Sequence, residues 1–293
     1  MRQLKIGTVC SGIEAPIQAL ESLGVPFDHL FSCESDTACQ QVIHPPVLYD
    51  DMWDMSERSD LPYCDILVAG LPCQAFSNIG QQGGLDDPRG LLFIPLCNIL
   101  RKIQPKYLIF ENVLNMLKHN DGKSFWLIQK LLETHGYVLK HAVLKSSDYG
   151  LPQMRKRVYV VGYHEDDPDG AAYEFPEPVP LKITLDEILG GKCSRDTAFT
   201  LRVGGRCSPI DDRHNWDGYW VDGKEMRIGP EHACRLQGFP KDFYDGIDIS
   251  DTEKMKQMGN TMTVPVMSAV ISNLLFNGVT ISEILSLSRQ SSQ

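Results

Sequence analysis

The sequence predicts an α/β fold, in which a mostly parallel sheet carries helices on both faces and a smaller, irregular lobe is added. Three observations support this prediction. Short apolar runs alternate with amphipathic stretches through the first half of the chain, as strands alternate with helices in such folds. The alternation stops after Gly162, where turn residues, prolines and glycines follow. An apolar helical pattern then returns from about residue 265 to residue 276.

Six strands are expected in the first half, each a short apolar run, at residues 4–9, 29–34, 65–69, 107–111, 137–144 and 157–163. Helices are expected between them, where apolar residues recur with helical spacing, at residues 15–23, 37–42, 91–103 and 124–134. Parallel sheets bind their ligands beyond the carboxyl ends of the strands. Residues that directly follow a strand are therefore the first candidates for a functional site.

The composition is that of an ordinary soluble enzyme, with 42% hydrophobic and 23% charged residues. No apolar run approaches the roughly twenty residues of a membrane-spanning helix. The first residues lead straight into a strand without the apolar region of a signal peptide. We therefore expect an intracellular, cytoplasmic protein that does not contact a membrane.

The nine cysteines favour neither a metal site nor disulfides. Their number is odd and no two form a Cys-x-x-Cys pair, so zinc binding and a disulfide framework are both disfavoured. No metal is expected, and any single cysteine is first interpreted as a small buried apolar residue.

The net charge of −10 is unusual for a protein that binds nucleic acid, but the distribution of charge matters more than its sum. Residues 140–157 and 192–227 are rich in Lys and Arg, whereas residues 164–187 are strongly acidic. One basic cleft on an acidic body is therefore possible.

Three short motifs follow or begin predicted strands. Cys73 comes directly after Pro72 at a strand end, and Glu111 stands at the end of another strand. Arg155 and Arg157 alternate into the sixth strand, so their side chains should share one face. Taken singly, Cys73 is explained equally well as a structural cysteine, whereas Glu111 is better explained as a helix-capping acid and the two arginines as solvated surface charge.

Together, and in this order, the motifs Pro-Cys-Gln, Glu-Asn-Val and Gln-x-Arg-x-Arg resemble the DNA cytosine-5 methyltransferase family. Residues 77–92 are similar to the loop beside that family's nucleophile, with Gly80, Gly83 and Gly84 to let it close. Residues 235–240, Arg-Leu-Gln-Gly-Phe-Pro, and residues 258–261, Met-Gly-Asn-Thr, resemble two later motifs. The resemblance covers nearly the whole chain and implies a seven-stranded, Rossmann-like sheet for S-adenosylmethionine.

The resemblance also implies a mechanism. Cys73 would add to carbon 6 of cytosine as a thiolate, which makes carbon 5 electron-rich. Glu111 would hold or protonate ring nitrogen 3, Arg157 would contact the carbonyl, and Arg155 would steady the site. The target base lies inside a duplex and would be flipped out.

For the cofactor, the resemblance implies a set of residues after the first, second and third strands and in the closing motif. Glu34 would bind the ribose hydroxyls, Asp51 the adenine amino group, and Asn260 would support the cofactor. The other members of the set are Cys10, Ser11, Gly12, Ile13 and Pro72. The family usually has an aromatic residue at the position of Cys10 and more glycine near Glu14.

The domain division implied is a catalytic, cofactor-binding domain of residues 1–182 and 253–293, with an inserted target-recognition domain of residues 183–252. The last helix would pack beside the first. The residues expected to contact DNA are Gln74, Ser77, Arg89, Thr200, Arg202, Arg206 and Arg213, with Gly204, Gly205, His214 and Asn215 nearby. The expected partners are double-stranded DNA and a cognate restriction endonuclease, and the enzyme would be a monomer of bacterial or phage type.

Three alternatives remain open. A tRNA cytosine-5 methyltransferase shares the fold but typically carries a Cys-Phe-Thr motif that this chain lacks. A non-catalytic DNA-binding derivative would be free to lose Cys73, Glu111 or the arginines, yet all are present. A thiol hydrolase would need a histidine partner at a strand end, and none fits.

Overall fold

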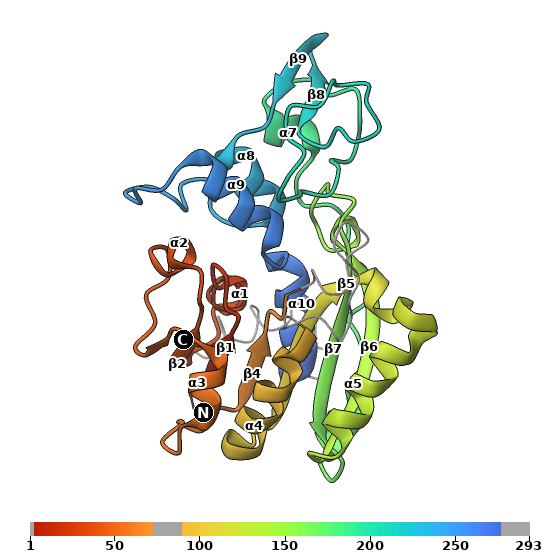
Figure 1. Cartoon of the computed structure of the whole chain (residues 1–293). Helices are drawn as coiled ribbons and strands as arrows, with labels where there is room; N and C mark the ends of the chain where they lie inside the picture. Colours follow the sequence, from red (N-terminus) through yellow and green to blue (C-terminus); the bar gives the residue numbers. More distant parts are fainter. Residues whose placement is uncertain (1–2, 73–89, 277–293) are drawn as a thin grey trace, which may run out of the picture.

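Figure 1 shows the computed structural model, which describes residues 3–72 and 90–276. A seven-stranded sheet has the order β3-β2-β1-β4-β5-β7-β6. Strand β7 runs antiparallel to both of its neighbours, and the remaining pairs are parallel. The strands are β1 (Leu4–Val9), β2 (Phe27–Cys33), β3 (Leu48–Tyr49), β4 (Ile66–Ala69), β5 (Tyr107–Val113), β6 (Tyr137–Lys145) and β7 (Lys156–His164).

Helices cover both faces of this sheet, and each face has its own apolar core. One core joins Ile6, Val68 and Ile109 to α1 (Ala15–Leu23) and α10 (Val264–Phe276). The other joins Leu67, Leu108 and Val160 to α3 (Met52–Glu57), α4 (Phe93–Ile103) and α5 (Lys123–Glu133). Neighbouring residues of β4 and β5 alternate between the two cores, as strands buried on both faces require.

The remaining elements are short. They are α2 (Thr37–Gln40), α6 (Pro168–Ala172), α7 (Leu185–Leu189), α8 (Pro230–Gln237), α9 (Asp251–Asn260), and the 3-10 turns η3 (Gly90–Leu92), η4 (Leu114–Leu117), η5 (His119–Gly122) and η6 (Ser146–Asp148). Strands β8 (Gly218–Val221) and β9 (Lys224–Arg227) form a separate antiparallel hairpin. Figure 1 shows α7 and this hairpin beyond one end of the sheet, with α8 and α9 between.

The α/β class, the six expected strands and the seven-stranded sheet are confirmed, with boundaries displaced by no more than two residues. The seventh strand, β3, is only two residues long, which is too short for any periodicity to predict. The expected helix at 37–42 stops at Gln40, because the next residues form a turn before Pro45 and Pro46. The last helix does pack beside the first: the Ser22 and Ser268 hydroxyls are 2.9 Å apart.

The lobe at residues 183–252 is largely irregular, as expected, but it has a small core of its own around Trp216 and Tyr219, each 1% exposed. Asp217 beside them is fully buried and forms ion pairs with Arg206 and Arg227. Over the described ranges, no helix is long and apolar enough to cross a membrane.

Candidate active site

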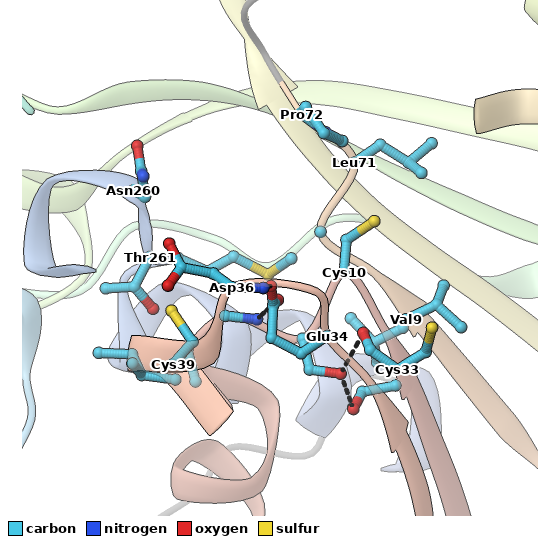
Figure 2. A pocket seen from close by; sticks show the side chains of 18 of the residues that line it. Val9, Cys10, Cys33, Glu34, Asp36, Cys39, Leu71, Pro72, Asn260 and Thr261 are labelled. Carbon is cyan, nitrogen blue, oxygen red and sulfur yellow. Dashed lines mark hydrogen bonds between the residues drawn. The ribbon is translucent and has the colours of Figure 1, made fainter. Parts of the chain in front are cut away.

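A cavity of about 350 Å³ opens beyond the carboxyl ends of β1, β2 and β4. Between β1 and β4 the chain changes the direction in which it adds strands, and doubly wound sheets bind ligands at such a point. Figure 2 shows the segments that meet there. The cavity is lined by all eight expected cofactor residues and the three described catalytic ones: Cys10, Ser11, Gly12, Ile13, Glu34, Asp51, Pro72, Asn260, Glu111, Arg155 and Arg157.

The loop after β1 is a tight turn. Cys10 and Gly12 both have left-handed backbones, with φ of 48° and 55°. Gly70, at the end of neighbouring β4, lies so close that a Cβ there would be 2.4 Å from the Cys10 carbonyl oxygen. Only glycine permits this approach, so the two strand ends converge on the cavity.

Glu34 follows β2 and is 9% exposed. Its Oε2 accepts a hydrogen bond from the Gly12 N–H at 2.7 Å, and its Oε1 accepts one from the Asp36 N–H at 2.8 Å. Burial raises the pKa of Glu34, and these two backbone donors oppose the rise. Each carboxylate oxygen has further acceptor capacity, so Glu34 can also receive hydroxyl donors from a ligand.

Two other acids at this edge have structural partners. Asp51 begins α3, and its Oδ1 accepts from the N–H groups of Trp53 and Asp54. Asp36 begins α2 and forms an ion pair with Lys256 of α9 at 3.0 Å. The sequence analysis did not single out Asp36. Its ion pair connects α2 to α9, two helices that lie far apart in the chain, and Asp36 itself lines the cavity.

A compact charged cluster lies at the end of β5. Glu111 is 7% exposed, and its Oε1 lies 3.0 Å from Nε of Arg157 and 3.9 Å from a terminal nitrogen of Arg155. Both arginines therefore face one carboxylate, as the alternation predicted. Burial raises the pKa of Glu111, while Arg157 and then Arg155 oppose that rise. A carboxyl group with a raised pKa is suited to proton transfer near neutral pH.

Arg155 also joins this cluster to the closing motif. It is 2% exposed and donates to the carbonyl oxygens of Gly259 and Thr261, at 3.1 and 2.7 Å. Asn260, between them, is exposed and lines the cavity. The turn that carries Asn260 is thus held by the same side chain that faces Glu111.

Cys73, Gln74, Ser77 and Arg89, with the glycines of the expected closing loop, lie outside the described residues. The segment just before Cys73 is placed by Asn112, which is fully buried and donates through its side-chain amide to the Leu71 carbonyl oxygen at 3.3 Å. Asn112 follows Glu111 directly, so the end of β5 positions both the Glu111 carboxyl group and the backbone at Leu71.

Two glutamines missed as functional positions form the centre of a buried network behind the site. Gln153 donates to the Leu236 carbonyl oxygen at 2.7 Å and accepts from the Leu201 N–H. Gln237 donates to the Met258 carbonyl oxygen and accepts from the Thr263 hydroxyl. The network connects the Gln-x-Arg-x-Arg, Arg-Leu-Gln-Gly-Phe-Pro and Met-Gly-Asn-Thr motifs. The sequence around the two glutamines does not indicate whether their side chains are buried or exposed, so the network could not be predicted.

The described residues of the lobe that were expected to contact DNA differ in exposure and in their contacts within the protein. Arg202 and Arg213 are exposed, and the Thr200 hydroxyl donates to the Met154 carbonyl oxygen. Arg206 instead turns into the lobe, where it pairs with Asp217 and donates to the Ile228 carbonyl oxygen. The Arg206 side chain is still 30% exposed, so its contact with DNA stays a prediction.

Asn215, which was also expected near the grooves of DNA, lies inside the lobe. Asn215 is 4% exposed, and its amide donates to the carbonyl oxygens of Ile210 and Gly218. Its hydrogen-bonding groups are used inside the lobe, so it is not available to read a base.

Among the residues that the structure describes, three with thiol side chains line the cavity: Cys10, Cys33 and Cys39. Burial raises the pKa of Cys33 and Cys39 to about 12, and that of Cys10 higher still. Such thiols stay protonated and unreactive at neutral pH. Within residues 3–72 and 90–276, no cluster of His, Cys, Asp or Glu could hold a metal ion.

These features define a class: an α/β protein with a cavity at its strand ends, where doubly wound sheets bind their ligands, and with a buried acid beside two arginines. Residues 4–203 and 211–275 match the family model for C-5 cytosine-specific DNA methylase. The chain belongs to this family, and its activity is that of a DNA cytosine-5-methyltransferase.

Relatives of known name agree with this assignment. The chain is 32% identical to the type II methyltransferase M.HaeII of Haemophilus aegyptius, over 94% of each chain. It is 31% identical to M.SsoII of Shigella sonnei, over 84% of this chain and 73% of that one.

Solved structures show the same fold at low sequence identity. The Dnmt2 methyltransferase of S. pombe matches with a TM-score of 0.67 and 17% identity, over 94% of this chain and 98% of that one. The methyltransferase EhMeth of Entamoeba histolytica matches with a TM-score of 0.65 and 16% identity, over 94% and 99%.

Proposed function

We propose that this enzyme transfers a methyl group from S-adenosylmethionine to carbon 5 of cytosine within a short specific sequence of double-stranded DNA. Cys73 acts as the covalent nucleophile, and the target cytosine is flipped out of the helix. The observation that carries the proposal is that one cavity is lined both by the Glu111–arginine cluster and by Glu34, the acid that follows β2.

The residues around the cavity fit this cofactor. Glu34 stands at the end of the second strand with acceptor capacity for the ribose hydroxyls, as in nucleotide-binding sheets. Asp51 would hold the adenine amino group, the loop at Cys10–Ile13 with Pro72 would hold the methionine part, and Asn260 would support the cofactor, since all of these residues line the cavity. When bound, S-adenosylmethionine supplies an electrophilic methyl group.

The protein's own groups then act on the cytosine. The Cys73 thiolate forms a bond to carbon 6, and the electron pair that is displaced makes carbon 5 nucleophilic. Glu111 holds or protonates ring nitrogen 3, Arg157 donates to the ring carbonyl oxygen, and Arg155 keeps Glu111 and the Asn260 turn in place. After methylation a base removes the carbon 5 proton, and the sulfur–carbon 6 bond breaks to release the thiolate.

The lobe of residues 183–252 is proposed to select the sequence, and residues 1–182 with 253–293 to form the catalytic domain. Exposed Arg202 and Arg213 are the described side chains proposed to meet DNA. Gln74, Ser77 and Arg89 complete the proposed contact set from the loop after Cys73. We further propose an intracellular monomer, paired with a restriction endonuclease of the same target.

The test is bisulfite sequencing of plasmid DNA from a host that lacks cytosine methylation and expresses the wild type or Cys73→Ser. We expect protected cytosines in one short motif with the wild type and none with Cys73→Ser. Cys207→Ser, in the exposed part of the lobe, is the matched control and should protect as the wild type does.

Protection that persists in Cys73→Ser would remove Cys73 from the mechanism. If the wild type protects no cytosine in DNA, the same variants should be assayed on tRNA, and methylation there would replace the proposed substrate.

A further inference from the structure

Glu14 has an unusual position at the beginning of α1. Its backbone is left-handed, with φ of 59°, and its side chain makes no capping hydrogen bond to the helix. The residue is nevertheless 8% exposed. A left-handed backbone is strained for any residue with a Cβ, and a buried carboxyl group loses its hydration. Glycine would avoid both penalties, so the carboxyl group must serve contacts that glycine lacks.

Those contacts lead back beneath the cofactor loop. The fully buried Ser32 hydroxyl, on β2, donates to Oε1 of Glu14. The Thr8 hydroxyl, on β1, donates to Ser32 at 3.0 Å and lies 2.6 Å from the Ser11 hydroxyl. A continuous chain of hydroxyls therefore runs from Glu14 to Ser11, and Thr8 and Ser11 both line the cofactor cavity.

Backbone hydrogen bonds of the loop connect the same residues. The Glu14 N–H donates to the Ser11 carbonyl oxygen at 3.0 Å, and the Ser11 N–H donates to the Cys33 carbonyl oxygen at 3.1 Å. The next N–H, of Gly12, reaches Glu34, the proposed ribose ligand. The left-handed turn, the hydroxyl chain and the cofactor acid are thus one connected unit.

We propose that Glu14 is a positioning residue for the cofactor: through Ser32 and Thr8 its carboxyl group fixes Ser11 and the turn at Cys10–Gly12. Glu14 itself does not touch the cofactor. The inference rests on the proposed binding of S-adenosylmethionine in this cavity, and it concerns a segment in which the family usually has more glycine.

The protonation state of Glu14 affects this arrangement. Burial raises the pKa of Glu14 to about 7, with Ser32 opposing and Glu21 adding to the rise. His29 of β2 has its Nε2 3.5 Å from the carboxylate, and burial lowers the pKa of His29. Glu14, Glu21 and His29 also line a second hollow, separate from the cofactor cavity, and the other titratable groups that line it are Asp28 of β2 and His44. Helix α10, which packs on α1, has no titratable side chain. Above pH 7 the ionised carboxylate is therefore the stronger acceptor for Ser32.

The test measures binding of S-adenosylhomocysteine by calorimetry from pH 6 to pH 8 for the wild type, Glu14→Gln and Glu14→Gly. We expect the wild type to bind about threefold more tightly at pH 8 than at pH 6, the size of effect that a modestly strengthened hydrogen bond gives. Glu14→Gln should match the wild type at pH 6 and lack this gain. Glu14→Gly, which relaxes the backbone but breaks the chain, should bind at least about fivefold more weakly at every pH.

Glu21→Gln, on the exposed face of α1, is the matched control and should keep most of the pH dependence. The pKa of Glu34 is also raised, but its titration is common to all variants and cancels in the comparison. Binding by Glu14→Gly equal to that of the wild type, or a Glu14→Gln profile parallel to the wild type, would overturn the proposal.

A second readout needs no cofactor. Amide hydrogen exchange of the free enzyme should accelerate about tenfold or more at Ser11 and Gly12 in Glu14→Gly, while the amides inside β2 stay protected. Unchanged exchange in the loop would refute the positioning role even if the wild type bound no S-adenosylhomocysteine. Failure of the proposed function is thereby distinguished from failure of this inference.

Discussion

At the scale of single residues, the proposed chemistry depends on how the surroundings of Glu111 set the pKa of its carboxyl group. Glu111 is buried at the end of β5, so burial is the largest influence on its pKa, and two guanidinium groups oppose the rise without cancelling it. A carboxyl group in this position keeps its proton to a higher pH than an exposed glutamate does. In the proposed mechanism, this proton would be donated to ring nitrogen 3 when charge develops there.

Glu111→Gln tests this role. The amide keeps the size and can still donate a hydrogen bond, but it cannot transfer a proton, so we expect kcat to fall about 10² to 10³-fold. In the wild type, kcat should decline as pH rises through the raised pKa, because the protonated form is lost. This decline should be absent in the residual activity of Glu111→Gln.

The measurement is steady-state methylation of a target duplex from pH 6 to pH 9, with binding of S-adenosylhomocysteine as the control. If Glu111→Gln lowered cofactor binding as much as kcat, the side chain would be a structural support rather than a catalytic group.

At the scale of elements, the site depends on joints between segments that are distant in sequence. Helix α8 ends at Gly238, whose backbone is left-handed with φ of 83°. A Cβ at Gly238 would lie 2.4 Å from Cδ of Pro265, at the start of α10. This contact brings the Gln237 network, the Asn260 turn and the last helix to one point.

Gly238→Ala should therefore lower the free energy of unfolding by about 2–5 kcal/mol, the sum of a strained backbone and an overpacked contact. Gly246→Ala is the matched control. Its φ is 77°, but an added Cβ there meets no atom within 4 Å, so only the backbone strain of about 1–2 kcal/mol applies. Equal losses in urea denaturation would show that the Pro265 contact does not matter.

Much of this element scale could be predicted from the sequence. The strands and helices of the first half follow from their periodicity, and the site residues at the ends of β1, β2, β4 and β5 follow from the rule that ligands bind there. Strand β3 could not be predicted, because it exists through pairing with β2 rather than through its own pattern.

Side chains inside the lobe were harder to predict. Arg206 and Asn215 look in the sequence like Arg202 and Arg213, since all are polar residues in a glycine-rich stretch. Only the folded lobe shows that Arg206 neutralises a buried acid and that Asn215 bonds to backbone. Burial of a polar side chain is decided by partners that a linear pattern does not contain.

At the scale of the whole molecule, the negative net charge is compatible with DNA binding only if a few cations face the duplex. The double variant Arg202→Ala, Arg213→Ala should bind a target duplex more weakly. The slope of log binding constant against log salt concentration should become shallower by about two, as expected for the loss of two phosphate contacts. The fold should be unaffected, because both side chains are exposed.

Lys130→Ala, on an exposed face of α5, removes a cation on a helix that covers the sheet and should leave the salt dependence unchanged. Arg206→Ala should instead lower the melting temperature, since buried Asp217 would keep only Arg227 as an ion-pair partner. An unchanged salt dependence in the double variant, measured by titration at several salt concentrations, would move the DNA surface elsewhere.

The convergence of both halves of the chain on one cavity also has a consequence for synthesis. Residues 8–13 supply one wall, whereas Gln257 to Met262 supply another. At about 5–20 residues per second, a ribosome takes many seconds to pass from the first wall to the second. Throughout that interval the cavity lacks one of its walls, so we expect cofactor binding to wait until residues 257–262 have emerged. We therefore expect methylation only from chains that extend beyond Met262, and a product cut short before Gln257 should fail to modify DNA.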